Sequence, residues 1–193
     1  MPPVVVFLIG AFALLVMAEA AYYYVKTYNG LVDSRNNILR AWSNIDVLLK
    51  QRMDEIPNLV STVKGYVAHE HGIFVEVAKA RTTLEQARTV GEKEASDNII
   101  RETLGRLYAV VEDYPVLKAD QSFLKLQVRI TQIENQIADR REFYNSAATI
   151  YNTRIQSIPD NIVANHSGFG RIPLFKASDE ERRRIEVFFR GNG

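Results

Sequence analysis

The chain of 193 residues contains no cysteine, which excludes a disulfide framework, thiolate-bound metals and cysteine nucleophiles. Its 24 basic residues nearly balance its 23 acidic residues. Neither sign forms a long block that could neutralise phosphates, so we expect no nucleic-acid partner. Glycine and proline are also few, and the residues between them are those typical of long helices. These absences together favour an all-α protein.

Charged residues are missing from the N-terminal segment Pro2–Ala18, and after Glu19 the apolar run resumes and includes Tyr22–Tyr24. A helix crosses the hydrocarbon with about 20 mostly apolar residues, and tyrosines are typical of the membrane interface. We therefore predict a transmembrane anchor over residues 1–25, with the lipid bilayer as a partner. Glu19 either lies near the interfacial end or has a function, because a carboxylate is costly in hydrocarbon.

A cleaved secretory signal is the competing interpretation of this segment, because Ala18-Glu19-Ala20 has the small-x-small form of a peptidase site. Against it, no Lys or Arg precedes the apolar run, and the run is long for a signal. Basic residues follow the run at Lys26, Arg35 and Arg40, and cytoplasmic flanks retain basic residues. The predicted localisation is the cell membrane, single-pass, with the N-terminus outside and the remainder cytoplasmic.

Beyond the anchor, four apolar stripes with spacings of three and four predict four amphipathic helices. The first should continue from the anchor, interrupted at most near Asn29-Gly30, and bend at Pro57. Ser96 or Asp97 should cap the third helix and Ser122 the fourth. The stripes are Leu31, Ile38, Trp42, Ile45, Leu49 and Met53; Val60, Val63, Val67, Phe74, Val77, Arg81 and Leu84; Ile100, Leu104, Leu107, Val111 and Tyr114; and Phe123, Leu126, Ile130, Ile133, Ile137, Tyr144, Ala147 and Tyr151.

Four amphipathic helices joined by short breaks can hide their stripes only against one another, and short connections make neighbours antiparallel. We therefore predict an antiparallel four-helix bundle over residues 26–158 and an irregular C-terminal tail over residues 159–193 that packs on the bundle or on a neighbour. An extended coiled coil with other chains is the alternative, and the unequal segment lengths count against it. Trp42, in the middle of the first stripe, is the expected core anchor.

The sequence His69-Glu70-His71 is the one cluster that looks catalytic. A zincin needs two histidines four residues apart, and a ferritin-like site needs a glutamate three residues before a histidine. Neither spacing occurs here, and side chains two residues apart point about 200° apart on a helix. We therefore predict no metal, no cofactor and no enzymatic activity. A metal-dependent enzyme that uses His69 and Glu70 stays as an alternative.

A second pattern is the pair Tyr144-Asn145, repeated seven residues later as Tyr151-Asn152, with Glu134 and Arg141 on nearby turns. Such a repeat indicates either a buried polar network that fixes helix register or a surface for a partner. We favour the first interpretation.

Several strings also occur together along the chain. They are Tyr28-Asn29-Gly30-Leu31-Val32, Ala41-Trp42-Ser43-Asn44-Ile45-Asp46, Ile56-Pro57-Asn58-Leu59-Val60, Val63-Lys64-Gly65-Tyr66, His69-Glu70, Tyr114-Pro115, Phe143-Tyr144-Asn145, Tyr151-Asn152-Thr153-Arg154, Gly168-Phe169 and Pro173-Leu174-Phe175. This combination closely resembles the LemA family of bacterial and archaeal membrane proteins. The resemblance implies an N-terminal anchor, an antiparallel helical bundle and no assigned enzymatic activity, and it supplies no catalytic residues.

The leading hypothesis is a membrane-anchored scaffold or assembly protein that binds copies of itself or other membrane proteins. A membrane-shaping homo-oligomer is the alternative. Apolar residues of the tail motivate the homo-oligomer, because isolated monomers rarely expose such a patch; if the tail instead folds back on its own bundle, this motive is lost. The candidate structural or interaction residues are Glu19, Trp42, Pro57, Asn58, His69, Glu70, Tyr144, Asn145, Tyr151, Asn152, Phe169, Phe175, Phe188 and Phe189.

Overall fold

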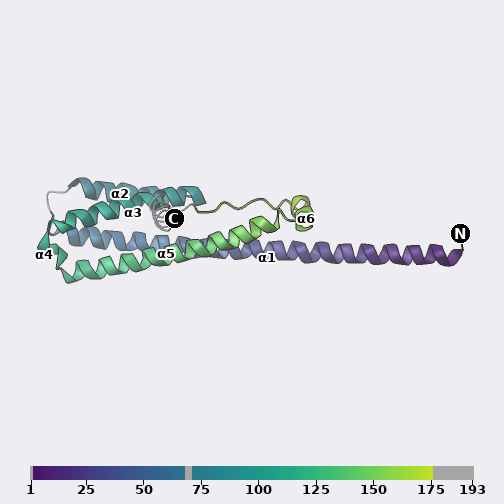
Figure 1. Ribbon diagram of the computed structural model, residues 1–193. Helices are drawn as coiled ribbons and strands as arrows, with labels where there is room; N and C mark the ends of the chain where they lie inside the picture. The colour runs from purple at the N-terminus through teal and green to yellow at the C-terminus, as the bar shows by residue number, and fades with distance from the viewer. Residues whose placement is uncertain (1, 68–70, 176–193) are drawn as a thin grey trace, which may run out of the picture. The chain divides into compact units, whose positions relative to one another are not determined.

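The computed structural model describes residues 2–67 and 71–175, and the regular structure of these residues is entirely helical, as predicted (Figure 1). The helices are α1 (Pro3–Lys64), α2 (His71–Gln86), α3 (Val90–Glu112), α4 (Pro115–Lys118), α5 (Gln121–Arg154) and α6 (Asp160–His166). The chain divides into two compact units. The first consists of Met1–Ala41 and Ser146–Ile172, and the second of Trp42–Asn145 and Pro173–Gly193.

Helix α1 is continuous, and the prediction that a separate second helix follows Pro57 is wrong. The helix continues through Pro57 to Lys64, so Val63 belongs to α1 and not to the next helix. An internal proline costs about 3 kcal/mol. Ile56, Leu59 and Val63 are all buried around it, and burying each such side chain contributes about 1.5–3 kcal/mol. Packing of this face therefore outweighs the missing backbone hydrogen bond.

In the first unit, α1 and α5 run antiparallel. Gly30 of α1 lies against Arg154 at the end of α5, and Tyr23, earlier in α1, donates a hydrogen bond to Asp160, later in the chain. A Cβ atom on residue 30 would lie 2.7 Å from Nη1 of Arg154. A side chain at position 30 would displace the guanidinium of Arg154, which is the end of a flexible side chain. The interruption considered for Asn29-Gly30 does not occur.

In the second unit, the Trp42–Lys64 part of α1 packs with α2, α3 and the first part of α5. Neighbouring helices run antiparallel and α1 runs parallel to α3, which gives the up-down-up-down bundle that the sequence predicts. The pairs that establish these directions are Arg52–Glu134 and Glu55–Arg129 between α1 and α5, Glu76–Arg106 and Thr83–Ser96 between α2 and α3, and Asp46–Lys93 and Arg52–Asp97 between α1 and α3.

Most of the predicted stripe residues are buried. Trp42 is an exception, because its side chain is only half-buried. Its ring stacks on Phe175, with the two centroids 5.7 Å apart, and lies 6.2 Å from the ring of Tyr144. Trp42 therefore packs at the edge of the core against the C-terminal segment, and the prediction of a central core anchor is wrong.

The cap predicted for the third helix is also wrong. α3 begins at Val90, and Thr89 and Glu92 form a capping box in which each side chain accepts a hydrogen bond from the other residue's backbone. Ser96 and Asp97 lie inside the helix and are buried. In the sequence, Asp97 resembles a cap because aspartate is favoured at helix starts. Inside the helix, its burial is compensated by arginines that are distant in the sequence.

The fourth predicted helix, α5, is capped by Asp120 and not by Ser122. Oδ1 of Asp120 accepts hydrogen bonds from the backbone N–H groups of Ser122 and Phe123, at 2.8 and 2.9 Å. A carboxylate suits this position because it satisfies free N–H groups and meets the positive end of the helix dipole.

The predicted irregular tail contains a helix, so this part of the prediction is wrong. α6 begins directly after Pro159, and its Val163 and Ala164 are buried. Gly168 then turns the chain at a φ of 71°, a conformation that glycine adopts without strain. Residues 169–175 continue without helix or strand.

Candidate functional site

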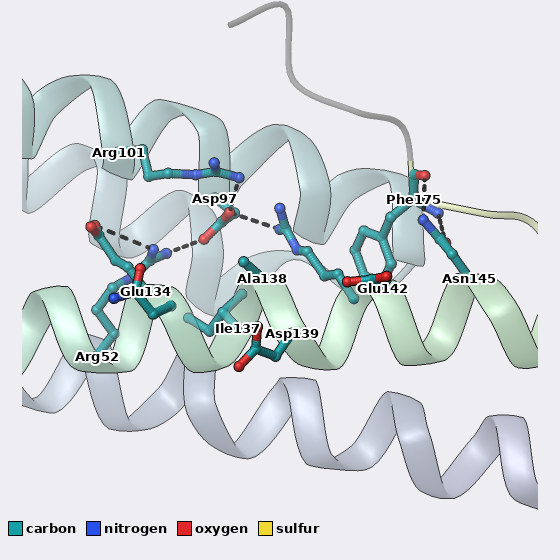
Figure 2. Close-up of a pocket in the computed structure, with 12 residues that line it drawn as sticks. Arg52, Asp97, Arg101, Glu134, Ile137, Ala138, Asp139, Glu142, Asn145 and Phe175 are labelled. Atoms are coloured by element: carbon teal, nitrogen blue, oxygen red, sulfur yellow. Dashed lines mark hydrogen bonds and ion pairs between the residues drawn. The ribbon is translucent and has the colours of Figure 1, made fainter. Parts of the chain in front are cut away.

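The most completely buried charges among the described residues meet in the second unit. Asp97 of α3 is 0% exposed and Arg52 of α1 is 1% exposed, and the guanidinium of Arg52 donates a hydrogen bond to Oδ1 of Asp97. Arg101 and Arg141 donate to Oδ2 of Asp97 at 3.0 and 2.7 Å. Figure 2 shows Arg52 and Arg101 directed at the Asp97 carboxylate. One carboxylate thus receives three arginines, and we call these four residues the Asp97 cluster.

The arginines keep Asp97 ionised. Burial by itself would raise the pKa of the Asp97 carboxyl, but the charges of Arg52, Arg141 and Arg101 outweigh burial and hold the pKa below its ordinary value. Burial conversely lowers the pKa of the Arg141 guanidinium, partly opposed by Asp97. With its pKa lowered, the Asp97 carboxylate is ionised at neutral pH and is a weak base.

Glu134 of α5 has a different environment. Its carboxylate lies 3.9 Å from Nη1 of Arg52. Burial raises the pKa of Glu134, and the negative charge of Asp97 raises it further, against the lowering effect of Arg52 and Arg101. Nearby, burial and then the charge of Glu134 raise the pKa of the Tyr108 hydroxyl.

A cavity of about 550 Å³ lies beside the Asp97 cluster. All four residues of the cluster line it, together with Glu134, Asn135, Ile137, Ala138, Asp139, Glu142, Asn145 and Phe175. The labelled side chains in Figure 2 include both signs of charge around this space. The polar lining mixes arginines with carboxylates, so the cavity has no uniform attraction for anions or cations.

The geometry of the Asp97 cluster fits a role in helix pairing. Its members come from α1, α3 and α5, so the carboxylate links three helices of the second unit. Among the described residues, the Nε–H groups of Arg52 and Arg141 have no hydrogen-bond partner, which costs stability. A buried ionic cluster of this kind gives less stability than apolar packing, and its clearest benefit is to specify which helices pair and in which register.

The two Tyr-Asn pairs hold the C-terminal segment through its backbone. In the first unit, the hydroxyl of Tyr151 donates to the carbonyl of Gly170 at 3.2 Å. The amide of Asn152 both donates to the carbonyl of Ile172, at 2.7 Å, and accepts from its N–H, at 2.9 Å. The Asn152 side chain therefore satisfies both polar backbone groups of one residue.

The second unit repeats this arrangement. Tyr144 donates to the carbonyl of Pro173 at 3.0 Å, and the amide of Asn145 bonds both the carbonyl and the N–H of Phe175, each at 2.9 Å. The Phe175 ring packs between Trp42 and Tyr144 and lies 4.8 Å from the Arg141 guanidinium carbon, a cation–π distance. Each Tyr-Asn pair is thus a backbone clamp within its own unit.

The other predicted site residues that the structure describes take no part in the Asp97 cluster or in the two Tyr-Asn pairs. Glu19, Pro57 and Asn58 are exposed, and Phe169 packs edge-on against Tyr28, with ring centroids 5.6 Å apart. His69, Glu70, Phe188 and Phe189 lie outside the described residues. Within residues 2–67 and 71–175, no group of three or more His, Cys, Asp and Glu side chains is placed to hold a metal ion.

Sequence reasoning missed the roles of Arg52 and Asp97. A signal was present, because charged residues interrupt three of the buried stripes at helical spacing. Arg52 lies three residues after Leu49, Asp97 three residues before Ile100, and Arg141 four residues after Ile137. Charges of opposite sign on the apolar faces of helices that must pack together predict a buried ion pair.

Comparison with known proteins decides the family. A model of the LemA family matches residues 41–189, which is most of the second unit and part of the first. The chain belongs to the LemA family. This confirms the resemblance drawn from the sequence strings.

Curated relatives carry two kinds of name. Magnetosome protein MamQ 2 of Paramagnetospirillum magneticum is 30% identical over 175 residues, which are 77% of this chain and 64% of that protein. Magnetosome protein MamQ of Magnetospirillum gryphiswaldense is 26% identical with the same coverage of each chain. Protein LemA of Metamycoplasma hominis is 27% identical over 91% of this chain and 81% of its own length. The matched region thus spans less than two thirds of each MamQ relative.

Proposed function

We propose that this LemA-family chain is a non-enzymatic scaffold whose N-terminal helix anchors its bundle to a membrane. The observation that carries the proposal is the continuity of α1. Among the described residues, α1 is the one helix long and apolar enough to cross a membrane, and the same helix carries the buried stripe of the bundle. The apolar stretch and this stripe therefore belong to one element of secondary structure, which runs from Pro3 to Lys64.

The exposed side chains of the apolar stretch support an anchor. Phe7, Phe12 and Leu15 are each more than 60% exposed, and a soluble monomer rarely leaves a patch of this kind in water. From Pro3 to Tyr22, α1 is about 30 Å long at 1.5 Å per residue, which matches the hydrocarbon thickness of a bilayer.

The scaffold part of the proposal is supported by what the Asp97 cluster and the clamps do. Both features order helices and the C-terminal segment, and the carboxylate of the cluster is committed to arginines. None of the relatives named above has a reaction in its name. We propose a homo-oligomer or a complex with other membrane proteins as the assembled form, with the N-terminus outside and the bundle cytoplasmic.

Part of the apolar surface expected from the tail is not available for assembly. Phe175 is buried by its own unit and Phe169 packs on Tyr28, so neither provides a free contact. Exposed apolar side chains remain elsewhere, with Leu39 in the first unit and Val47 in the second both more than half exposed. These are candidate contacts for the assembly.

A charge-insertion experiment tests the anchor. Leu14→Arg combined with Leu15→Arg places two charges in the apolar stretch, at about 2.5–3.5 kcal/mol each by insertion scales. This variant should leave the carbonate-washed membrane fraction. Leu39→Arg is the matched control, because it changes an exposed leucine of the same helix outside the apolar stretch, and it should stay in the membrane fraction. Equal membrane retention of both variants would refute the anchor.

Light scattering in mild detergent tests the assembly separately. Full-length protein should have a mass above that of one chain, and Leu39→Asp or Val47→Asp should reduce it. A monomer for the unaltered chain would refute the homo-oligomer. Protease added to intact spheroplasts should spare the bundle, and its digestion from outside would reverse the proposed orientation.

A further inference from the structure

Two isoleucines of the first unit, just before and within α6, are exposed. Ile158 is 82% exposed and Ile162 is 67% exposed. They flank Asp160, the first residue of α6, and the other apolar residues of this short helix, Val163 and Ala164, are buried. Against the residues that the structure describes, the two exposed isoleucines therefore serve no packing role.

Contacts with α1 place this region at the end of the apolar stretch. The Asp160 carboxylate accepts hydrogen bonds from the hydroxyls of Tyr23 and, at 3.5 Å, Thr27. The hydroxyls of Tyr24 and Ser167 are hydrogen-bonded at 3.0 Å. Tyr24 also packs edge-on against His166, with ring centroids 6.0 Å apart. Both ends of α6 are thus attached to two consecutive tyrosines of α1, and Figure 1 shows the short helix α6 beside the long helix α1.

Those tyrosines mark the level of the bilayer boundary. With α1 anchored as proposed, the stretch from Pro3 to Tyr22 spans about 30 Å of hydrocarbon, which puts Tyr23 and Tyr24 at the interface, where tyrosine is favoured. Because α6 is tied to them, Ile158 and Ile162 lie at this level too. Exposed isoleucines at this depth meet acyl chains near the headgroups, where burial in lipid is favourable.

We propose that the segment Ile158–His166 is a second membrane contact, which inserts Ile158 and Ile162 into the interfacial region of the same leaflet beside the anchor. The occupant of this surface is phospholipid. The inference rests on the proposed anchoring of α1, with which this surface is continuous. Its consequence is that α1 and the end of α5 are held against the bilayer at two places, which limits tilting of the first unit.

The absence of native cysteine permits a direct test. Single-cysteine variants Ile158→Cys and Ile162→Cys of the full-length chain are labelled with an environment-sensitive fluorophore and reconstituted in phosphatidylcholine vesicles. Some of the lipid carries a nitroxide near the headgroup end of the acyl chain. Both labels should show blue-shifted emission and lose most of their fluorescence to the nitroxide.

Ile150→Cys is the matched control, because Ile150 is also an isoleucine of the first unit and is 65% exposed. Gly30 of α1, which lies against Arg154 of α5, is seven residues beyond Tyr23, and Ile150 is four residues before Arg154. At 1.5 Å per residue, Ile150 is therefore about 16 Å further from the apolar stretch than Tyr23 is, which is beyond the headgroup region. Its label should be neither shifted nor quenched.

Leu15→Cys separates this inference from the anchor. Its label should be quenched by a nitroxide deep in the acyl chain. If that occurs while the labels at 158 and 162 behave like the label at 150, the second contact is refuted and the anchor stands. Blue-shifted labels at 158 and 162 without lipid quenching would show that protein covers this surface, and would also refute it. An unquenched label at 15 would overturn the anchor and this inference together.

Discussion

In the first unit, the large apolar side chains of residues 4–25 are exposed, whereas in the second unit the charges of Arg52 and Asp97 are buried. Exposure to water is unfavourable for apolar side chains and favourable for charged groups. The exposed apolar stretch needs a surrounding that the chain does not provide, and the bilayer is the one proposed above. The buried charges instead compensate one another within the chain.

The two units also share a motif. A Tyr-Asn pair in each holds one residue of the C-terminal segment by both of its polar backbone groups. What differs is the neighbourhood. In the second unit the clamped residue, Phe175, packs on Trp42 and Arg141, whereas the clamped residue of the first unit is the half-buried Ile172.

Asp97→Asn should have the largest effect on stability. It leaves Arg52 buried without its carboxylate partner, and breaking a buried ion pair on one side costs about 3–5 kcal/mol. Thermal unfolding of full-length protein in mild detergent, followed by circular dichroism, measures the loss. An unchanged melting temperature would show that the Asp97 cluster is not held together in solution.

The pH dependence of the same variant gives a second measurement. The pKa of Asp97 is lowered in the folded state, so its ionised form contributes stability above its unfolded pKa of about 3.9. That contribution is lost as the pH falls through the lower folded pKa. Unaltered protein should therefore lose more stability on acidification than Asp97→Asn does. Parallel stability curves would contradict the lowered pKa.

Leu49→Ala and Leu15→Ala are the same change in the two parts of α1. Leu49 is 1% exposed in the second unit and Leu15 is 66% exposed in the apolar stretch. Leu49→Ala should lower the free energy of unfolding by about 2–5 kcal/mol, as for other buried leucines. Leu15→Ala should change the free energy of unfolding of the bundle by less than about 0.5 kcal/mol. Equal effects in detergent would mean that the apolar stretch packs against protein.

Asn145→Ala and Asn152→Ala compare the two clamps. Each leaves backbone polar groups of the C-terminal segment without partners, at about 1–3 kcal/mol. Asn145→Ala should also red-shift the fluorescence emission of Trp42, the single tryptophan. Without Asn145, the Phe175 ring is released from the indole of Trp42 and exposes it to water. Asn152 holds Ile172 and not Phe175, so Asn152→Ala should leave this emission unchanged. A shift in both variants would show that the two clamps release together.

Glu134→Gln should have the smallest effect. Because the pKa of Glu134 is raised in the folded state, its ionised form disfavours folding above that pKa, and the cost disappears as the pH falls. Removing the charge should therefore leave stability at pH 7 unchanged or raise it by less than about 1 kcal/mol. A loss as large as that of Asp97→Asn would place Glu134 within the ionic cluster as an essential partner.

Much of the fold follows from local patterns. The apolar stretch predicts a spanning helix by length and composition, and stripes at spacings of three and four predict the bundle, because helix geometry fixes which side chains share a face. Pro115 lies just after the end of α3 and is the first residue of α4, as expected of a residue that cannot continue a helix but suits a helix start. The separate second helix expected after Pro57 was wrong because a local preference of a few kcal/mol competes with packing of the surrounding face.

The sequence by itself determined that this protein has an apolar N-terminal helix, amphipathic helices and membership of its family, since these depend on composition and periodicity along the chain. Only the tertiary structure decided that Asp97 is an ion-pair centre and not a cap, and that the repeated asparagines hold the C-terminal segment. Both depend on partners 20 to 45 residues away. Spacing within one helix carries no information about which distant group will satisfy a polar side chain.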